Sequence, residues 1–219
     1  MRYTESIIST LIFFFILQLL SLWILIIPES EYRLLIVSFS SLIDSIVALT
    51  LLIIVFRKIN KQEILNFKGT NYRYYLLAII SGIGFVMTFP ILNTIYRLEL
   101  SENILSYNLT FEKLSSGYAL DLIIFTPIIE ELFFRNYIQK GLSKLYKPLN
   151  SIIVTALLFS MIHIPIFAFF IEFVDFSMYQ AFFALFGGII SGILYYKSKS
   201  LIPSILFHMI WNFLILIIN

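Results

Sequence analysis

The sequence contains no cysteine and little charge, and these two deficits exclude several classes of protein. Without cysteine there is no disulfide framework, no thiolate zinc site and no cysteine nucleophile. Only 13% of the 219 residues are charged, against about 25% in an average soluble domain. The formal net charge of +2 is too small to indicate a nucleic-acid partner.

Hydrophobic residues dominate what remains. They make up 60% of the chain, and the mean hydropathy is +0.95. A membrane-spanning helix needs about 20 consecutive apolar residues. We therefore predict an all-α, polytopic transmembrane helix bundle of about seven spans, in one integral membrane domain. The predicted spans are residues 6–27, 34–56, 74–96, 117–139, 149–168, 176–196 and 201–218.

The positions of the basic residues predict how the chain crosses the membrane. With a cytoplasmic N-terminus, the inner segments hold twelve of the fifteen basic residues, and only Arg33, Arg97 and Lys113 lie outside. This split follows the positive-inside rule. We expect a multi-pass protein of the cell membrane with its N-terminus inside and its C-terminus outside. Residues 165–180 are the weakest part of this map, because Pro165 or the Glu172/Asp175 pair can interrupt a span.

Several ionisable residues fall inside the predicted spans. Such groups are costly in lipid and usually face the interior of the helix bundle. The chain has only two histidines, and both lie in predicted spans. The complete set is Asp44, Asp121, Glu130, Glu131, Arg135, His163 and His208.

Spacing along the helices divides these residues into faces. Glu131 and Arg135 are four residues apart, so they share a helix face and can form an ion pair. Glu130 is rotated by about 100° from Glu131 and can point elsewhere. His208 and Asn212 also share a face. A purely structural interpretation treats the ion pair, the histidines and the asparagine as packing and interhelical hydrogen bonding.

The depth of these residues predicts that they meet. At 1.5 Å per residue, Glu130, His163 and His208 lie about 15, 20 and 10 Å from the cytoplasmic ends of their spans. Three helices of the C-terminal half would then supply one buried site on the cytoplasmic side. Residues 117–219 form this predicted core, and residues 1–116 supply helices without a motif.

The residue types at this site are those of hydrolysis. A buried glutamate can act as a general base, and histidines can position water or stabilise an oxyanion. The chain has no G-x-S-x-G elbow and no H-E-x-x-H motif. Glu130, His163 and His208 could still ligate zinc with an open fourth position. The residues therefore favour hydrolysis of a peptide bond inside the membrane, and the cofactor stays either none or zinc.

Three motifs in order resemble one known family. They are E-E-x-x-x-R at residues 130–135, F-x-x-x-H at 159–163 and H-x-x-x-N at 208–212. This set resembles the CPBP family of intramembrane endopeptidases, which includes the type II CAAX prenyl proteases and the bacterial Abi, or bacteriocin self-immunity, proteins. The matching core covers about residues 117 to 218.

The resemblance implies a role for each motif residue. Glu130 matches the glutamate that activates the attacking water, and Glu131 and Arg135 match its supporting partners. His163, His208 and Asn212 match the residues that position water and stabilise the oxyanion. The family implies either a metal-free glutamate mechanism or a metalloprotease. Its helix between the second and third motifs tends to contain small residues, and here Gly188-x-x-x-Gly192 supplies a close-packing face.

The resemblance also suggests substrates and roles. The substrate would be a membrane-embedded or membrane-bound peptide or protein, cleaved in bacteriocin self-immunity or in the processing of a peptide signal. The count of seven spans, where prenyl proteases tend to have eight, weakens the expectation of a prenylated substrate. Two other functions stay open: a non-catalytic membrane immunity or scaffold protein, and a proton-coupled transporter that uses Glu130 and His208.

Overall fold

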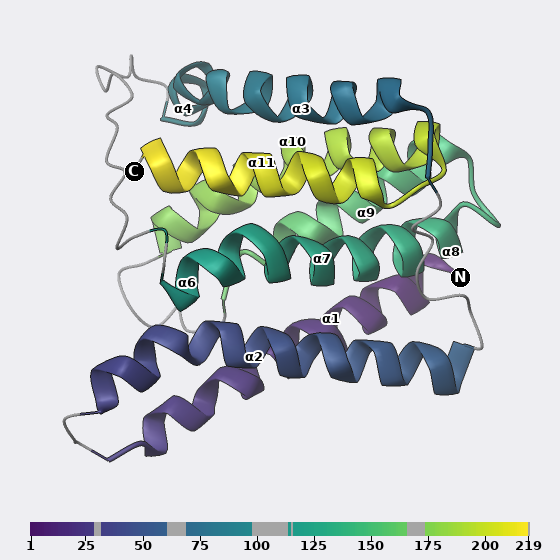
Figure 1. Cartoon of the computed structure of the whole chain (residues 1–219). Coiled ribbons are helices and arrows are strands. Elements are labelled where there is room, and N and C mark those ends of the chain that lie inside the picture. The colour runs from purple at the N-terminus through teal and green to yellow at the C-terminus, as the bar shows by residue number, and fades with distance from the viewer. Residues whose placement is uncertain (29–31, 61–68, 98–113, 115, 166–173, 219) are drawn as a thin grey trace.

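The computed structural model describes residues 1–28, 32–60, 69–97, 114, 116–165 and 174–218, and this part of the chain contains helices and no strand (Figure 1). The predicted all-α fold is confirmed. The α-helices are α1 (Tyr3–Leu20), α2 (Arg33–Val55), α3 (Tyr72–Met87), α4 (Phe89–Arg97), α6 (Gly117–Leu120), α7 (Thr126–Glu131), α8 (Lys140–Leu142), α9 (Pro148–Met161), α10 (Val174–Ser198) and α11 (Ile202–Ile218). The other helical segments are the 3₁₀-helix η1 (Ser21–Ile26) and the π-helices η2 (Phe56–Asn60), η3 (Asp121–Phe125) and η4 (Leu132–Gln139).

Each of the seven predicted spans coincides with helix, but not all of them are long, apolar helices. Within the described residues, three helices are long and apolar enough to cross a membrane: Tyr3–Ile26, Leu35–Lys58 and Val174–Ser198. A fourth span results if the bent pair α3 and α4 is taken as one. The helices α9 and α11 are shorter apolar helices of 14 and 17 residues. That these and the 117–139 segment also cross the bilayer stays a prediction.

The bend between α3 and α4 has a local cause. The two helices meet at 44°, and Pro90 follows directly after the first residue of α4. Proline has no N–H to donate and its ring clashes with the preceding turn, so a continuous helix is interrupted there. The hydroxyl of Thr88, at the break, donates a 2.6 Å hydrogen bond to the carbonyl of Phe85.

The predicted span over 149–168 is helical only as far as residue 161; residues 162–165 are not helical, and 166–168 lie outside the described residues. The helix α9 ends at Met161, and His163 lies in the turn that follows. Pro165 explains the early end, because proline disfavours helical backbone at the residue before it. Glu172 lies outside the described residues, whereas Asp175 is in the first turn of α10.

The C-terminal helices form the centre of the bundle. The pair α9 and α10 packs together, and α11 packs against α10, α3 and α7. In Figure 1, α11 lies between α3 and α7, while α1 and α2 form the lower layer. Both α1 and α2 present aliphatic side chains outward, as expected for helices in lipid; Leu19 and Leu35, for example, are 63% and 60% exposed.

The segment with the paired glutamates is an irregular helix rather than a straight span. It runs from Gly117 to Leu142 as α6, η3, α7, η4 and α8. Its first turn is capped by the hydroxyl of Ser116, which accepts from the amide of Ala119 at 3.1 Å. Two π-helical stretches flank α7, and such stretches often lie at functional sites. Both glutamates lie at the end of α7.

Candidate active site

The predicted ion pair between Glu131 and Arg135 is present and fully buried. The Nε of Arg135 lies 2.9 Å from Oε2 of Glu131, and both residues are 0% exposed. Ser191 of α10 completes the pair, since its hydroxyl donates to the same Oε2 at 2.6 Å and accepts from Nε of Arg135 at 3.1 Å. A buried charge pair needs such additional hydrogen bonds to offset its loss of hydration. The guanidinium of Arg135 and the hydroxyl of Ser191 therefore fix Glu131 in one orientation.

His208 of α11 lies between the two glutamates. Its Nδ1 is 3.2 Å from Oε1 of Glu131, and its Nε2 is 3.7 Å from Oε2 of Glu130. A carboxylate paired with a guanidinium only accepts hydrogen bonds, so Nδ1 of His208 is the donor to Glu131. This bond orients the imidazole and turns Nε2 toward Glu130.

Glu130 differs from its neighbour in having an unused carboxylate oxygen. The residue is 8% exposed, and its Oε2 is buried with no hydrogen-bond partner among the described residues. An unpaired buried oxygen is costly and calls for an explanation. The two adjacent glutamates thus have different surroundings: Glu131 is held by three partners, and Glu130 faces the histidine with an oxygen available.

Aromatic rings hold His208 in place. The indole of Trp211 stacks on the imidazole at a centroid distance of 5.0 Å and an interplanar angle of 22°. Phe159 of α9 packs edge-on against the same imidazole at 5.8 Å. Trp211 can approach because Gly187 lies beside it: a Cβ at Gly187 would come within 2.6 Å of the indole ring. This glycine is therefore required for the packing around the histidine.

The other histidine packs against Phe159, which also contacts His208. His163 was predicted inside a helix and instead lies in the turn after α9. Its Nδ1 lies 2.9 Å from the carbonyl oxygen of Phe159, and its ring packs against the Phe159 ring at 4.9 Å. Both histidine rings thus contact one phenylalanine, and His208 is the one next to the glutamates.

Asn212 of α11 makes a contact that the sequence pattern did not indicate. Its Nδ2 donates a 2.8 Å hydrogen bond to the carbonyl of Leu122 in η3. In the π-helical pattern the amide of Thr126 bonds to Asp121, so the next donor would be residue 127. That residue is Pro127, which has no N–H. The asparagine therefore satisfies a carbonyl that the proline leaves unpaired, and interhelical hydrogen bonding accounts for its present contact.

The glycine pattern on α10 packs as predicted. A Cβ at Gly188 would lie 3.2 Å from the Cα of Ala156 in α9, and one at Gly192 would lie 3.0 Å from Oε1 of Gln139. The Nε2 of Gln139 also donates to the carbonyl of Gly192 at 2.9 Å. The close approach of α10 brings Ser191, one residue before Gly192, to the ion pair.

Sequence reasoning did not identify Ser191 or Trp211 as site residues. Ser191 is the only polar residue in the apolar run from 181 to 194, and that is a signal that could have found it. Trp211 gives no such signal, because an aromatic residue beside a motif histidine is ordinary in a membrane helix. Its position is visible only in the packed structure.

A metal site is not formed by the side chains as they are placed. Among the described residues, no group of three His, Asp or Glu side chains lies close enough to hold a metal ion. The set considered for zinc, Glu130, His163 and His208, lies within the described residues. These three side chains are therefore not placed to bind a metal ion together. We therefore derive no step through one.

The two aspartates predicted at membrane depth have hydrogen-bond partners of their own. Asp44 accepts from Nε1 of Trp23 at 2.6 Å, and Asp121 accepts from the hydroxyl of Thr126 at 3.2 Å. Asp121 is in η3, one turn or more before the glutamates, and Asp44 is in α2. The contact of Asp44 joins α2 to η1, whereas that of Asp121 lies within its own irregular helix.

Comparison with known proteins gives one family match. Residues 114–214 match the family described as "Rce1-like: Type II CAAX prenyl endopeptidase Rce1-like". No curated protein matches the chain, and neither does any solved structure. The matched residues include the whole buried cluster around the glutamates, namely Glu130, Glu131, Arg135, Ser191 and His208. Residues 114–214 of this membrane protein are therefore similar to the Rce1-like type II CAAX prenyl endopeptidases, in agreement with the family that the three sequence motifs resemble.

Proposed function

We propose that this protein is an intramembrane endopeptidase in which Glu130 activates the attacking water. The observation that supports the proposal most strongly is the difference between the two glutamates. Glu131 is fixed by Arg135, Ser191 and His208. Glu130 has a buried oxygen that has no hydrogen-bond partner in the described part of the chain and lies 3.7 Å from Nε2 of His208. A general base needs an acceptor oxygen that is not already hydrogen-bonded and that a water molecule can reach.

The proposed reaction has two steps. In the first, Glu130 takes a proton from a water molecule while the water oxygen forms a bond to the carbonyl carbon of the substrate. The carbonyl π electrons move to its oxygen and form a tetrahedral oxyanion. In the second, the oxyanion re-forms the carbonyl, the C–N bond breaks, and the proton on Glu130 passes to the leaving nitrogen. The products are a carboxylic acid and an amine, and no other reactant is consumed.

The neighbouring residues have supporting roles in this proposal. Glu131 acts through His208, because its hydrogen bond to Nδ1 orients the ring and sets where Nε2 points. The Nε2 side of His208 faces Glu130, where it can position the water or stabilise the oxyanion. Arg135 neutralises Glu131. Asn212 and His163 act indirectly. Asn212 holds the backbone of η3, and His163 packs against the ring of Phe159.

The substrate is proposed to be a membrane-embedded or membrane-bound peptide or protein. The family acts on CAAX-type peptides, and the buried position of the glutamates in an apolar bundle suits a substrate that enters from the membrane. Bacteriocin self-immunity and the processing of a peptide signal are the biological roles proposed for the reaction. Residues 117–219 are proposed as the catalytic part, in a multi-pass protein of the cell membrane.

The test compares the membrane and secreted peptides of cells that contain the wild-type chain, Glu130→Gln or His208→Gln. Glu130→Gln keeps the shape of the side chain and removes the base. His208→Gln keeps the approximate length of the side chain and removes the imidazole. Removing a general base lowers the rate by about 10²–10⁴-fold, so each variant should accumulate the uncleaved substrate. The variant Asp175→Asn, at an exposed acidic residue in the first turn of α10, is the control and should cleave normally.

The outcomes separate the competing functions. Full cleavage by Glu130→Gln in protein that inserts normally would contradict the proposed mechanism. A biological effect that survives both variants without any cleavage would instead indicate a non-catalytic immunity or scaffold protein. Cleavage that stops on addition of a zinc chelator and returns with zinc would indicate a metalloprotease. We expect purified wild-type protein to be unaffected by the chelator.

A further inference from the structure

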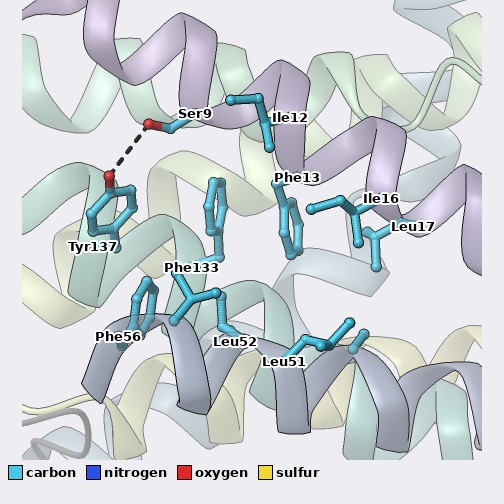
Figure 2. Close-up of a pocket in the computed structure, with 12 residues that line it drawn as sticks. Ser9, Ile12, Phe13, Ile16, Leu17, Leu51, Leu52, Phe56, Phe133 and Tyr137 are labelled. Atoms are coloured by element: carbon cyan, nitrogen blue, oxygen red, sulfur yellow. Dashed lines mark hydrogen bonds between the residues drawn. The ribbon is translucent and has the colours of Figure 1, made fainter. Parts of the chain in front are cut away.

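An apolar pocket lies between α1, α2 and η4. Its volume is about 220 Å³. Figure 2 shows that side chains from all three elements point into it. The lining is apolar except at one end, where Ser9 and Tyr137 meet.

The mouth of the pocket faces outward between two candidate membrane spans. Ile12 and Ile16 of α1 are 55% and 41% exposed, and Leu51 and Val55 of α2 are 41% and 43% exposed. By contrast, Phe13, Leu52 and Phe133 on the inner wall are buried. Both helices belong to segments long and apolar enough to cross a bilayer. The molecules that meet such an opening are the hydrocarbon chains of lipids.

One end of the pocket is polar. The hydroxyl of Ser9 lies 3.4 Å from the hydroxyl of Tyr137, and the two form the only polar pair drawn in the pocket (Figure 2). The next residues after Phe56, at this end of α2, are the exposed Arg57 and Lys58. The one carboxylate near the start of α1, that of Glu5, accepts a 2.9 Å hydrogen bond from the amide of Arg2.

We propose that this pocket binds one acyl chain of an anionic phospholipid of the surrounding bilayer. The chain lies along Phe13, Leu52 and Phe133, the ester group lies at the Ser9–Tyr137 end, and the phosphate lies near Arg57 and Lys58. The volume suits part of a hydrocarbon chain, since an apolar protein cavity of about 150 Å³ already binds benzene. Basic residues beside a membrane helix attract anionic lipids, and each contributes about fivefold in binding.

The position of the pocket gives the bound chain a structural role. Phe133 and Tyr137 belong to η4, which begins directly after Glu131. Phe13 of α1 stacks on Phe133 at a centroid distance of 4.0 Å and an angle of 9°. A chain that fills the space beside this stack therefore supports the helix on which both glutamates lie. This role does not depend on the proposed peptidase chemistry.

The first experiment measures lipid bound to the purified full-length chain by native mass spectrometry, with added phosphatidylglycerol as the probe. The variant Ala48→Phe places a ring in the pocket, and Ile46→Phe is the matched control, because Ile46 is exposed on the same helix and does not line the pocket. We expect one retained lipid on the wild type and on Ile46→Phe, and at least tenfold weaker retention on Ala48→Phe. Equal retention by all three would overturn the proposal.

A second measurement needs no variant in the pocket wall. A phospholipid with a photoreactive acyl chain is added to wild-type protein, and the labelled peptides are mapped. We expect saturable labelling around Ile12 and Leu51 that excess phosphatidylglycerol removes. Labelling that does not saturate means ordinary lipid contact only, and it would overturn the proposal even if Ala48→Phe did not fold.

The choice of lipid is tested with Arg57→Gln combined with Lys58→Gln. Wild-type protein should prefer phosphatidylglycerol over phosphatidylcholine, and the double variant should lose most of this preference, a reduction of about tenfold or more. A preference that is unchanged would remove the anionic headgroup from the proposal. If a prenylated peptide displaces the lipid at lower concentration than phosphatidylglycerol does, the pocket belongs to the substrate, and the phospholipid assignment is wrong.

Discussion

Nδ1 of His208 lies 3.2 Å from Oε1 of Glu131, although the two residues are 77 positions apart in the chain. This contact joins the last helix of the bundle to the helix with the paired glutamates. It also distinguishes the glutamates from each other, because the histidine is held by one and turns its second nitrogen toward the other. The predictions below test this arrangement and the contacts that maintain it.

Replacing Glu131 by glutamine should destabilise the protein as well as inactivate it. Arg135 is fully buried and would lose its carboxylate, and removing one partner of a buried ion pair costs about 3–5 kcal/mol. The free energy of unfolding in detergent measures this loss. The double variant Glu131→Gln, Arg135→Met should recover part of the stability but none of the cleavage. Equal stability of wild type and single variant would mean that the pair is not buried as described.

Ser191 is proposed as a positioning residue for Glu131, and Ser191→Ala should lower kcat. The serine hydroxyl donates to Oε2 of Glu131 at 2.6 Å, and a hydrogen bond to a charged group contributes about 1.5–3 kcal/mol. We expect kcat to fall by about tenfold or more with KM little changed. Measuring kcat and KM separately in the same detergent checks this.

Ser204→Ala is the control for this serine. Ser204 is also fully buried, and its hydroxyl donates to the backbone carbonyl of Ser191 at 3.0 Å without contacting the glutamate. It should lose stability to a similar extent and keep its kcat. If both variants lose kcat equally, the serine near Glu131 acts only by packing.

The contact of Asn212 with the backbone should depend on Pro127. Asn212→Ala leaves the carbonyl of Leu122 without its 2.8 Å donor and should cost about 1–3 kcal/mol. In a Pro127→Ala background, residue 127 has an amide that can bond to the same carbonyl. The cost of Asn212→Ala should then fall by at least about 0.5 kcal/mol. Unfolding free energies of the four proteins give this coupling, and strictly additive effects would contradict the explanation.

Gly187→Ala should displace Trp211 and disturb His208. An added Cβ would lie 2.6 Å from the indole ring, so the ring has to move. Overpacking of this kind costs about 1–3 kcal/mol, and loss of the stacked ring should lower the cleavage rate. A shift in the fluorescence of Trp211, recorded in a Trp23→Phe background, reports the displacement. Gly84→Ala, where a Cβ meets open space, is the control and should leave both readouts unchanged.

The predicted orientation can be tested directly because the chain has no cysteine. Single cysteines at two exposed positions, Arg97→Cys and Lys144→Cys, give reporters for the two sides. With the N-terminus inside, a membrane-impermeant maleimide added to intact cells should label residue 97 and not residue 144. Lysis should make residue 144 reactive. The reverse pattern would require the opposite orientation.

The sequence alone determined the class of fold and the local pairing. Long apolar segments predict helices because lipid requires every backbone group to bond within its own segment. The pairing of Glu131 with Arg135 follows from the four-residue spacing, which is a property of any α-helix. The Gly188-x-x-x-Gly192 pattern likewise predicts a close-packing face on its own helix, and the structure shows that α9 packs there. Each of these inferences depends on neighbours in the chain.

Only the tertiary structure decided which groups surround the glutamates. Ser191, His208 and Trp211 reach the site through the packing of α10 and α11 on the glutamate helix. No spacing within one helix specifies the register between two helices, since side-chain packing over the whole bundle sets it. The same reason explains why the asparagine partner in η3 and the apolar pocket beside Phe133 were not predicted, and why the position of His163 in the turn after α9 was not foreseen.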